Sequence, residues 1–206
     1  MSDPDWLGWA KQLAALAQTG LAFSHNDFDR ERYAAVQEIA AAMLAAGSGL
    51  PPEPLQALLG AETGYATPKV DVRAAVFRDD RILLVRERSD GRWTLPGGWA
   101  DVGDSPHQAA EREVREESGY EVRARKLAAV FDRNRHAHTV HAFHIWKLFF
   151  ICELTGGQPR ESIETDGVEF FALDALPQLS TGRVTAAQIA HMYEHYRDPQ
   201  RATSFD

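Results

Sequence analysis

The chain has 206 residues and a formal net charge of −8, with 44% hydrophobic and 25% charged residues. These values are typical of a globular protein long enough for one ordinary domain and a small additional one. The acidic balance argues against a protein that mainly grips a nucleic-acid backbone, because such proteins neutralise many phosphates with Lys and Arg. Cys152 is the single cysteine, which excludes an internal disulfide and argues against a cysteine-based zinc site.

The first residues contain no basic run followed by an apolar core, and no apolar stretch approaches about 18 residues. We therefore expect a soluble, cytoplasmic protein without a membrane partner. A chain of this length can bury most of its apolar surface, so no disulfide or structural metal is needed to hold the fold together.

The first 60 or so residues are predicted to be helical. Residues 4–19 place apolar side chains at roughly helical spacing, and Gly20 is expected to stop this helix. A second helix is expected over residues 30–46, with Asp27 or Asp29 as its N-terminal cap. The further expected features are a stop formed by Gly47, Gly49 and the pair Pro51-Pro52, a short helix over 53–60 and a linker over 62–69.

From Val70 onward the pattern changes to runs of β-forming residues. A hairpin turn is expected at Asp79-Asp80, between two such runs. The expected strands cover residues 70–77, 81–87, 93–95, 121–131, 141–154 and 167–173, and the expected helices cover residues 107–119 and 183–198.

Residues 96–120, PGGWADVGDSPHQAAEREVREESGY, form the segment with the clearest chemical signal. At 3.6 residues per turn, Glu113, Glu116 and Glu117 lie within an arc of about 100° on one helix face. Three carboxylates so close repel each other, and hard divalent cations such as Mg²⁺ or Mn²⁺ prefer such oxygen-rich sites. A solvated acidic helix face is the alternative interpretation.

This segment resembles the Nudix box, whose pattern is Gly, five residues, Glu, seven residues, and Arg-Glu-apolar-x-Glu-Glu-x-Gly-apolar. One position departs from it, because Asp104 stands where the family usually has Glu, and its shorter arm leaves its contact to Arg112 open. The residues in register are Gly98, Arg112, Glu113, Val114, Glu116, Glu117, Gly119 and Tyr120.

The resemblance covers about Pro68 to Gln178 and implies an α/β fold, the Nudix α/β/α sandwich with a mixed sheet. We place a small all-helical N-terminal domain at residues 1–62 and the Nudix hydrolase domain at residues 63–206. The apolar stripes of the helices need a surface to pack against, which favours a packing or dimerisation element and a homodimer. A lid over the active site is the alternative.

The family cleaves nucleoside diphosphates linked to another moiety, X, by attack of water on phosphorus. The N-terminal helices resemble the extension that precedes some Nudix domains acting on such substrates, which favours ADP-ribose, giving AMP and ribose 5-phosphate. A CDP-alcohol, a UDP-sugar or a damaged nucleoside triphosphate are alternative substrates. A nucleotide-sensing module without catalysis is a further alternative, although it could lose the three glutamates that this chain retains.

The resemblance also assigns roles to individual residues. Glu113, Glu116 and Glu117 would bind Mg²⁺ or Mn²⁺ together with the main-chain carbonyl of Gly97, and Arg112 would hold the glutamates in place. The family often takes its general base from a loop outside the box, where Glu164 is the first choice and Glu161 the second.

Substrate contacts are expected from four side chains. A guanidinium group matches a phosphate bidentately, so an arginine in or beside a strand could hold the diphosphate, with a surface ion pair as the alternative. An aromatic ring after the Gly pair could stack on a base or only cover the loop. The candidates are Arg73, Arg86, Arg133 and Trp99, and the expected partner is a small nucleoside diphosphate derivative, not a nucleic acid.

Overall fold

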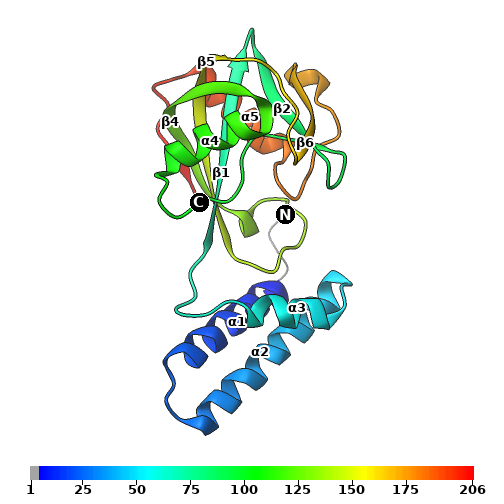
Figure 1. Cartoon of the computed structure of the whole chain (residues 1–206), viewed down its shortest axis with the longest axis vertical. Helices are drawn as coiled ribbons and strands as arrows, with labels where there is room; N and C mark the ends of the chain where they lie inside the picture. The colour runs from blue at the N-terminus through cyan, green and yellow to red at the C-terminus, as the bar shows by residue number, and fades with distance from the viewer. Residues whose placement is uncertain (1–4) are drawn as a thin grey trace. The chain divides into compact units, whose positions relative to one another are not determined.

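The computed structural model describes residues 5–206, which form two compact units (Figure 1). The helical unit comprises the described residues up to Pro68 together with Val140–His144, and the sheet unit comprises Lys69–Thr139 and Ile145–Asp206. The division falls after Pro68, whereas the boundary expected from the sequence lies between residues 62 and 63, at the start of the linker. Within the described residues, no helix is both long and apolar enough to span a membrane.

Three helices build the helical unit: α1 (Asp5–Phe23), α2 (Asp27–Ser48) and α3 (Pro52–Gly60). The expected start of the first helix at residue 4 lies outside the described residues. The connection between α1 and α2 is short, and Figure 1 shows the two helices running antiparallel. The buried core consists of Leu7, Ala10, Ala14, Ala40, Ala41, Leu44, Ala45, Leu55 and Leu59, against which Ala142 and Phe143 pack.

Gly20 does not stop α1 and Gly47 does not help to stop α2, so both expectations from the sequence are wrong: the helices continue past these glycines. A Cβ atom at Gly20 would lie 2.5 Å from the ring of Tyr33, and one at Gly47 would lie 1.6 Å from the ring of Trp6. Each glycine makes room for an aromatic ring of the facing helix. This packing outweighs the low helix propensity of glycine.

The N-terminus of α2 is capped by Asn26, and not by Asp27 or Asp29 as expected from the sequence. Oδ1 of Asn26 accepts hydrogen bonds from the main-chain N–H groups of Phe28 (2.8 Å) and Asp29 (3.4 Å). Asp27 and Asp29 lie in the first turn, where their charges interact favourably with the helix dipole.

The sheet unit contains a seven-stranded mixed sheet in the order β3-β2-β1-β5-β4-β7, with β6 also paired to β2. β1 is parallel to β5, and β4 is antiparallel to β5. The elements are β1 (Lys69–Arg78), β2 (Arg81–Glu87), β3 (Trp93–Thr94), α4 (Pro106–Ser118), β4 (Tyr120–Asp132), η1 (Arg133–Arg135), β5 (Ile145–Gly157), β6 (Thr165–Phe171), η2 (Leu173–Ala175), α5 (Ala186–Arg197) and β7 (Ser204–Phe205).

The hairpin expected between the first two strands is confirmed. Asp79 and Asp80 have φ values of 52° and 58°, which match the left-handed positions of a type I′ turn. The strand expected over 141–154 begins only at Ile145, because residues 141–144 belong to the helical unit.

Helices cover both faces of the sheet, which confirms the expected α/β/α sandwich (Figure 1). Along β1, Val72 and Val76 belong to the same core cluster as Val114 of α4. Ala75 points to the opposite face and belongs to the cluster that contains Ile189 of α5. The alternation of side chains along a strand therefore gives each face of β1 its own helix.

The sheet splits between β1 and β2, and a loop occupies the gap. β1 pairs with β2 only over its last two residues, 77–78. Alongside residues 70–74, the loop formed by residues 96–100 takes the place of β2 and makes three main-chain hydrogen bonds of 2.8, 2.9 and 3.0 Å to β1. The glycine pair is thus held at the centre of the sheet, ahead of α4.

A buried ion cluster lies on β1 and β5 beside this loop. Nε and Nη2 of Arg73 lie 2.8 and 2.9 Å from the two carboxylate oxygens of Asp71, and Nζ of Lys147 lies 3.0 Å from Oδ1. Arg73 also donates to the carbonyl of Leu95, at 3.1 Å. Burial alone would raise the pKa of Asp71, but its two cationic neighbours lower it to about 2. The cluster therefore joins the two strands to the loop.

Replacing Asp71 by Asn is expected to lower the free energy of unfolding by about 3–5 kcal/mol, because Arg73 and Lys147 would remain buried without a counter-charge. The matched control is Asp80→Asn, which removes an exposed partner of Arg197 and is expected to change stability little. Urea unfolding followed by tryptophan fluorescence measures both variants. Equal losses in the two would contradict the structural importance of the Asp71 cluster.

Candidate active site

α4 carries the acidic segment, and its ends are fixed by the local sequence. Gln108 reaches back so that its Oε1 accepts the N–H of Ser105 at 3.0 Å, as in a capping box, and Pro106 occupies the first turn. Gly119 ends the helix with φ of +74°, in the left-handed region. Between these ends, Ala110 and Val114 pack on the sheet and direct the glutamates toward the loop.

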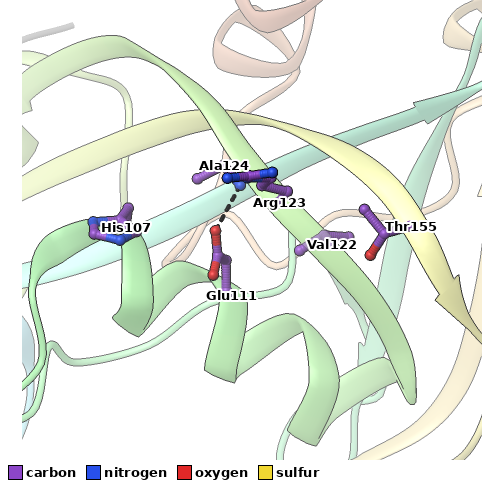
Figure 2. A pocket seen from close by; sticks show the side chains of 6 residues that line it. All are labelled: His107, Glu111, Val122, Arg123, Ala124 and Thr155. Atoms are coloured by element: carbon purple, nitrogen blue, oxygen red, sulfur yellow. Dashed lines mark hydrogen bonds between the residues drawn. The ribbon is translucent and has the colours of Figure 1, made fainter.

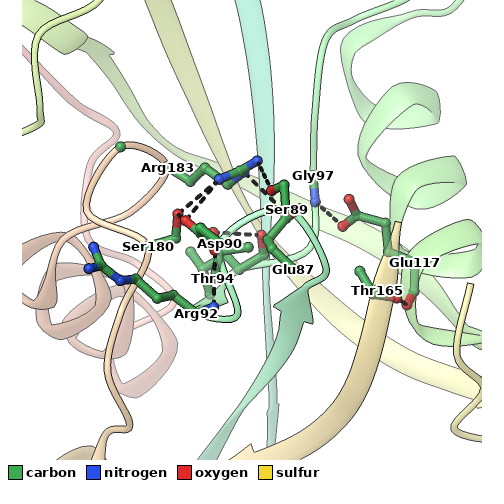
Figure 3. Close-up of polar contacts among 12 residues, drawn as sticks. Glu87, Ser89, Asp90, Arg92, Thr94, Gly97, Glu117, Thr165, Ser180 and Arg183 are labelled. Atoms are coloured by element: carbon green, nitrogen blue, oxygen red, sulfur yellow. Dashed lines mark hydrogen bonds and ion pairs between the residues drawn. The ribbon is translucent and has the colours of Figure 1, made fainter. Parts of the chain in front are cut away.

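The three glutamates differ sharply in burial. Glu117 is 4% exposed and Glu113 is 9% exposed, whereas the side chain of Glu116 is 54% exposed. Oε2 of Glu117 accepts the main-chain N–H of Gly97 at 2.9 Å, a contact drawn in Figure 3. The main-chain carbonyl of Glu117 accepts the hydroxyl of Thr165, at 2.6 Å, so the start of β6 is attached to the end of α4.

Gly97 and Gly98 are needed for this close approach. A Cβ atom at Gly97 would lie 2.0 Å from the carbonyl oxygen of Val72, and its φ of +144° suits glycine. A Cβ at Gly98 would lie 3.1 Å from Oε2 of Glu113. The three main-chain hydrogen bonds between the loop and β1 use the carbonyls of Pro96, Gly98 and Val70, and none of the three uses the carbonyl oxygen of Gly97. This oxygen is therefore a candidate ligand atom.

Arg112 connects the acidic residues to each other. Its guanidinium group lies 2.9 Å from Oδ2 of Asp104, 2.8 Å from Oε1 of Glu113 and 3.1 Å from Oε2 of Glu116. The contact that the sequence left open is therefore made, because the shorter arm of Asp104 still reaches the guanidinium group. Asp101 adds a fourth carboxylate at 3.2 Å.

The charge of the buried glutamates is incompletely balanced. Burial raises the pKa of Glu117 to about 8, although Arg73 and the N–H of Gly97 oppose this shift. Burial also raises the pKa of Glu113, against the opposing effect of Arg112. Nearby positive charge is thus too small to offset the cost of burying the two carboxylates, and a bound cation would supply the missing charge.

The donor set fits a hard divalent cation. The available atoms are carboxylate oxygens and one main-chain carbonyl, which are the ligands that Mg²⁺ and Mn²⁺ prefer. Within the described part of the chain, no three His, Cys, Asp or Glu side chains already lie close enough to hold one ion together. Arg112 draws Glu113 and Glu116 toward itself, so binding of an ion would require these side chains to turn.

Two of the four expected substrate residues are turned into the protein. Arg73 is 4% exposed and is engaged by Asp71, and Arg133 is 3% exposed. Nη2 of Arg133 donates to the carbonyls of Thr139 (2.7 Å) and Gly182 (3.2 Å). Neither guanidinium group is placed to meet a substrate phosphate.

The other two candidates are accessible. The side chain of Arg86 is 42% exposed, and its Nε lies 2.7 Å from Oδ1 of Asp166. Its guanidinium group lies 5.9 Å from the centre of the Trp93 ring. Trp99 is 47% exposed, immediately after the glycine pair.

The two loop glutamates have different surroundings. Oε2 of Glu161 lies 3.0 Å from Nη2 of Arg88, in an exposed ion pair. Glu164 precedes Thr165, and its main-chain carbonyl accepts the N–H of Arg88 at 2.8 Å. Burial is the main cause that raises the pKa of Glu87, and the charge of Glu164 adds to this rise.

A polar network that the sequence did not predict lies at the end of β2. Glu87 is 6% exposed, and its Oε1 lies 3.0 Å from Nε of Arg183. Arg183 also contacts Asp90 (3.3 Å) and the hydroxyl of Ser180 (3.0 Å), as Figure 3 shows. The charge of Glu87 also raises the pKa of Glu117, so the network borders the acidic site. No sequence signal links Glu87 to Arg183, because 95 residues separate them.

A separate surface pocket of about 580 Å³ lies between α4 and β4 (Figure 2). Glu111 projects roughly 160° around α4 from Glu113, so this pocket does not share the acidic face. Oε1 of Glu111 accepts the N–H of Ala124 at 2.8 Å, next to a register shift in β4. The lining residues are His107, Glu111, Val122, Arg123, Ala124 and Thr155.

The carboxylate helix α4 and the loop before it lie within a segment that matches a known protein family. A family model described as the NUDIX domain matches residues 67–193, which is more than half of the chain. The chain belongs to the Nudix family. A second family model, described as a UDP-X-like N-terminal oligomerisation domain, matches residues 4–59 of this Nudix protein.

Individual relatives agree with this assignment. YjhB of Bacillus subtilis (strain 168), whose own naming as an ADP-ribose pyrophosphatase is provisional, is 43% identical over 98% of this chain and 97% of its own length. The crystal structure of an ADP-ribose pyrophosphatase from Streptococcus suis 89-1591 is 40% identical, covering 68% of this chain and 100% of its own, with a TM-score of 0.61. A crystal structure of UDP-X diphosphatase is 36% identical, covering 100% of both chains, with a TM-score of 0.64.

The protein is therefore a Nudix pyrophosphatase, a hydrolase of the family whose members generally use divalent metal ions. The box in its sequence is the loop from Gly98 onward together with α4. The fold expected from the resemblance, a mixed sheet with helices preceded by N-terminal helices, is confirmed.

Without metal, the raised pKa of Glu117 makes stability depend on pH. The folded value of about 8 exceeds the reference value of 4.5, so the free energy of unfolding falls as pH rises from about 4.5 to 8. Glu117→Gln removes this dependence and is expected to be more stable than the unaltered protein at pH 8 in EDTA, by about 2–4 kcal/mol. The two should be nearly equally stable at pH 5.

Thermal and urea unfolding at pH 5 and pH 8, with EDTA or with Mg²⁺, measure this effect. Glu116→Gln is the matched control, because the exposed Glu116 side chain is already hydrated. The same gain at pH 8 in both variants would contradict a special burial cost at Glu117. Added Mg²⁺ should stabilise the unaltered protein more than the Glu117→Gln variant.

Proposed function

We propose that the protein hydrolyses the pyrophosphate bond of a nucleoside diphosphate linked to a second moiety, with ADP-ribose as the leading substrate. The products would be AMP and ribose 5-phosphate. The observation that carries the proposal is the pair of buried glutamates, Glu113 and Glu117, facing the loop of Gly97 and Gly98. The names of YjhB and of the Streptococcus suis protein support ADP-ribose.

A UDP-linked substrate is the second candidate. It is favoured by the match of residues 4–59 to the UDP-X-like domain and by the full-length similarity to UDP-X diphosphatase. Both candidates share the diphosphate and differ in the base and in X. The same acidic site therefore serves either one.

We assign the binding of Mg²⁺ or Mn²⁺ to Glu113, Glu116, Glu117 and the carbonyl of Gly97. A divalent cation held there would offset the charge of the diphosphate and lower the pKa of a bound water. Arg112 would keep Glu113 and Glu116 beside the site through its charge-assisted hydrogen bonds, and the two side chains would turn from it to reach the ion.

The general base is Glu164 in this proposal. It stands directly before Thr165, whose hydroxyl is bonded to the end of α4, so its main chain is held close to the glutamates. Glu161, the second choice, is occupied by Arg88. Glu164 would take a proton from the attacking water as the oxygen approaches phosphorus.

For substrate contacts we retain Arg86 and Trp99, which are accessible, as ligands of a phosphate and of a base. Arg73 and Arg133 have a positioning role instead. Arg73 supports the loop through the carbonyl of Leu95, and its charge favours the ionised form of Glu117. We also propose that the protein is a homodimer assembled through its N-terminal helices, supported by the oligomerisation-domain match.

Phosphate-coupled hydrolysis of ADP-ribose, a UDP-sugar, CDP-choline, NADH and an oxidised dNTP tests the proposal, each with Mg²⁺, with Mn²⁺ and with EDTA. We expect one diphosphate to be cleaved far faster than the others and no cleavage in EDTA. Glu117→Gln should reduce the rate by orders of magnitude. Failure to cleave any substrate, with folded protein and bound metal, would favour a sensing module.

Glu164→Gln is expected to lower kcat by about 100-fold or more, with a much smaller change in KM, because a general base acts mainly in the transition state. Glu161→Gln is the matched control and should retain nearly normal turnover. Steady-state kinetics on the best substrate measures both. The opposite result would assign the base to Glu161, and normal rates in both variants would exclude a loop glutamate.

A further inference from the structure

The loop between β5 and β6 carries Glu164, and the loop is bonded to the end of α4 at two points. On the side that follows β5, the main-chain N–H of Arg160 donates to the carbonyl of Ser118 at 2.9 Å. On the side that enters β6, the hydroxyl of Thr165 donates to the carbonyl of Glu117 at 2.6 Å. The part of the loop between these two bonds is therefore attached to the helix that carries the acidic residues.

Residues 162–165 form a tight turn, called the Glu164 turn below. The main-chain N–H of Ser162 donates to the carbonyl of Thr165 at 3.0 Å. Oγ of Ser162 accepts the N–H groups of Glu164 and Thr165, both at 3.0 Å. Loop residues are usually more mobile than the elements that they connect, but here hydrogen bonds hold the main chain next to the Glu164 side chain.

Arg88, at the end of β2, holds the Glu164 turn from the other side. Its main-chain N–H donates to the carbonyl of Glu164 at 2.8 Å. Its side chain reaches further along the loop, where Nε donates to the carbonyl of Ser162 at 3.2 Å. In addition, Nη2 lies 3.0 Å from Oε2 of Glu161. One arginine therefore contacts three of the four residues that lead up to β6.

A β-bulge brings the loop to this position. Arg86 of β2 lies opposite Gly167 of β6. The next residue, Glu87, lies opposite Thr165, so Asp166 is an extra residue in β6. Bulges are frequent beside active sites, where they bend a strand and redirect its side chains. Here the bulge ends the regular pairing of β6 with β2 at the point where the loop joins β6.

We propose that Arg88 is a positioning residue for the hydrolysis, because its side chain holds the Glu164 turn so that the Glu164 carboxylate stays directed at the attacking water. This inference rests on the proposed function, in which Glu164 is the general base, and adds the residue that orients it. A general base must lie within hydrogen-bond reach of the proton that it takes. Small displacements of a catalytic group lower the rate strongly.

The surroundings of Arg88 allow its side chain to be replaced without unfolding the protein. The side chain is 45% exposed, and the main-chain bond to Glu164 does not depend on it. An exposed ion pair contributes little by itself, which agrees with the small effect expected for Glu161→Gln. Arg88→Met differs from that variant, because it also removes the hydrogen bond to the carbonyl of Ser162.

Steady-state kinetics on the best substrate tests the positioning role. Arg88→Met is expected to lower kcat by about 10-fold or more and to change KM by less than about twofold, because Arg88 does not contact the substrate. Arg88→Lys keeps the charge beside Glu161 and should be intermediate. Arg92→Met is the matched control and should have normal kinetics, because Arg92 belongs to the same hairpin and its side chain is turned away from Glu117 in Figure 3.

A double-mutant cycle separates positioning of Glu164 from general damage to the fold. If Arg88 acts through Glu164, adding Arg88→Met to Glu164→Gln should slow the reaction no further. Independent effects would multiply instead, to a total loss of about 1000-fold.

Hydrogen exchange followed by mass spectrometry measures the Glu164 turn without a substrate. Arg88→Met should speed exchange of the main-chain N–H groups of Glu164 and Thr165 by roughly 10-fold, because the turn would open more often. Arg92→Met should leave this exchange unchanged.

Normal kcat in Arg88→Met, unchanged exchange in the turn, or rate losses that multiply in the double variant would each overturn the inference. Full activity of Glu164→Gln, or no hydrolysis of any substrate, would overturn the proposed function and the positioning role together. A slow Glu164→Gln variant beside a normal Arg88→Met variant would overturn the positioning role alone.

Discussion

The site depends on one constraint: a carboxylate, Glu117, is held away from water against the main chain of a loop. Its hydrogen bond to the N–H of Gly97 joins α4 to the loop, and the loop in turn pairs with β1 in place of β2. The positive φ of Gly97 and the lack of space for a Cβ follow from this arrangement. Burial raises the pKa of Glu117 to about 8, which a bound cation would reverse.

The surrounding charges partly offset the cost of burying Glu117 but do not cancel it. The Asp71, Arg73 and Lys147 cluster brings a buried positive charge near Glu117 and fixes the loop through Leu95. Arg112 gathers the more exposed carboxylates on the outer side of α4. The negative charges of the acidic residues are therefore only partly neutralised within the protein. Binding of a divalent ion would neutralise them further and so stabilise the folded state.

The sequence predicts correctly those features that depend on interactions between residues close together in the chain. The spacing of Glu113, Glu116 and Glu117 on one helix face, the hairpin at Asp79-Asp80 and the helical character of the first 60 residues all follow from short-range patterns. Gly20 and Gly47 were misread as helix stops, since the aromatic rings that require them come from distant positions. Likewise, Arg73 and Arg133 match phosphate ligands by residue type, but both are buried, which the sequence does not show.

The sequence by itself determined the family resemblance, the carboxylate helix and the order of elements. The periodicity of helices and strands and the spacing of the motif both involve residues that are close together in the chain. Only the tertiary structure decided which carboxylates are buried, that Glu87 meets Arg183, and that residues 140–144 join the helical unit. Burial and charge pairing depend on residues that are far apart in the chain. Burial and charge pairing therefore contribute to stability only when the sheet, the loop and the helices are assembled.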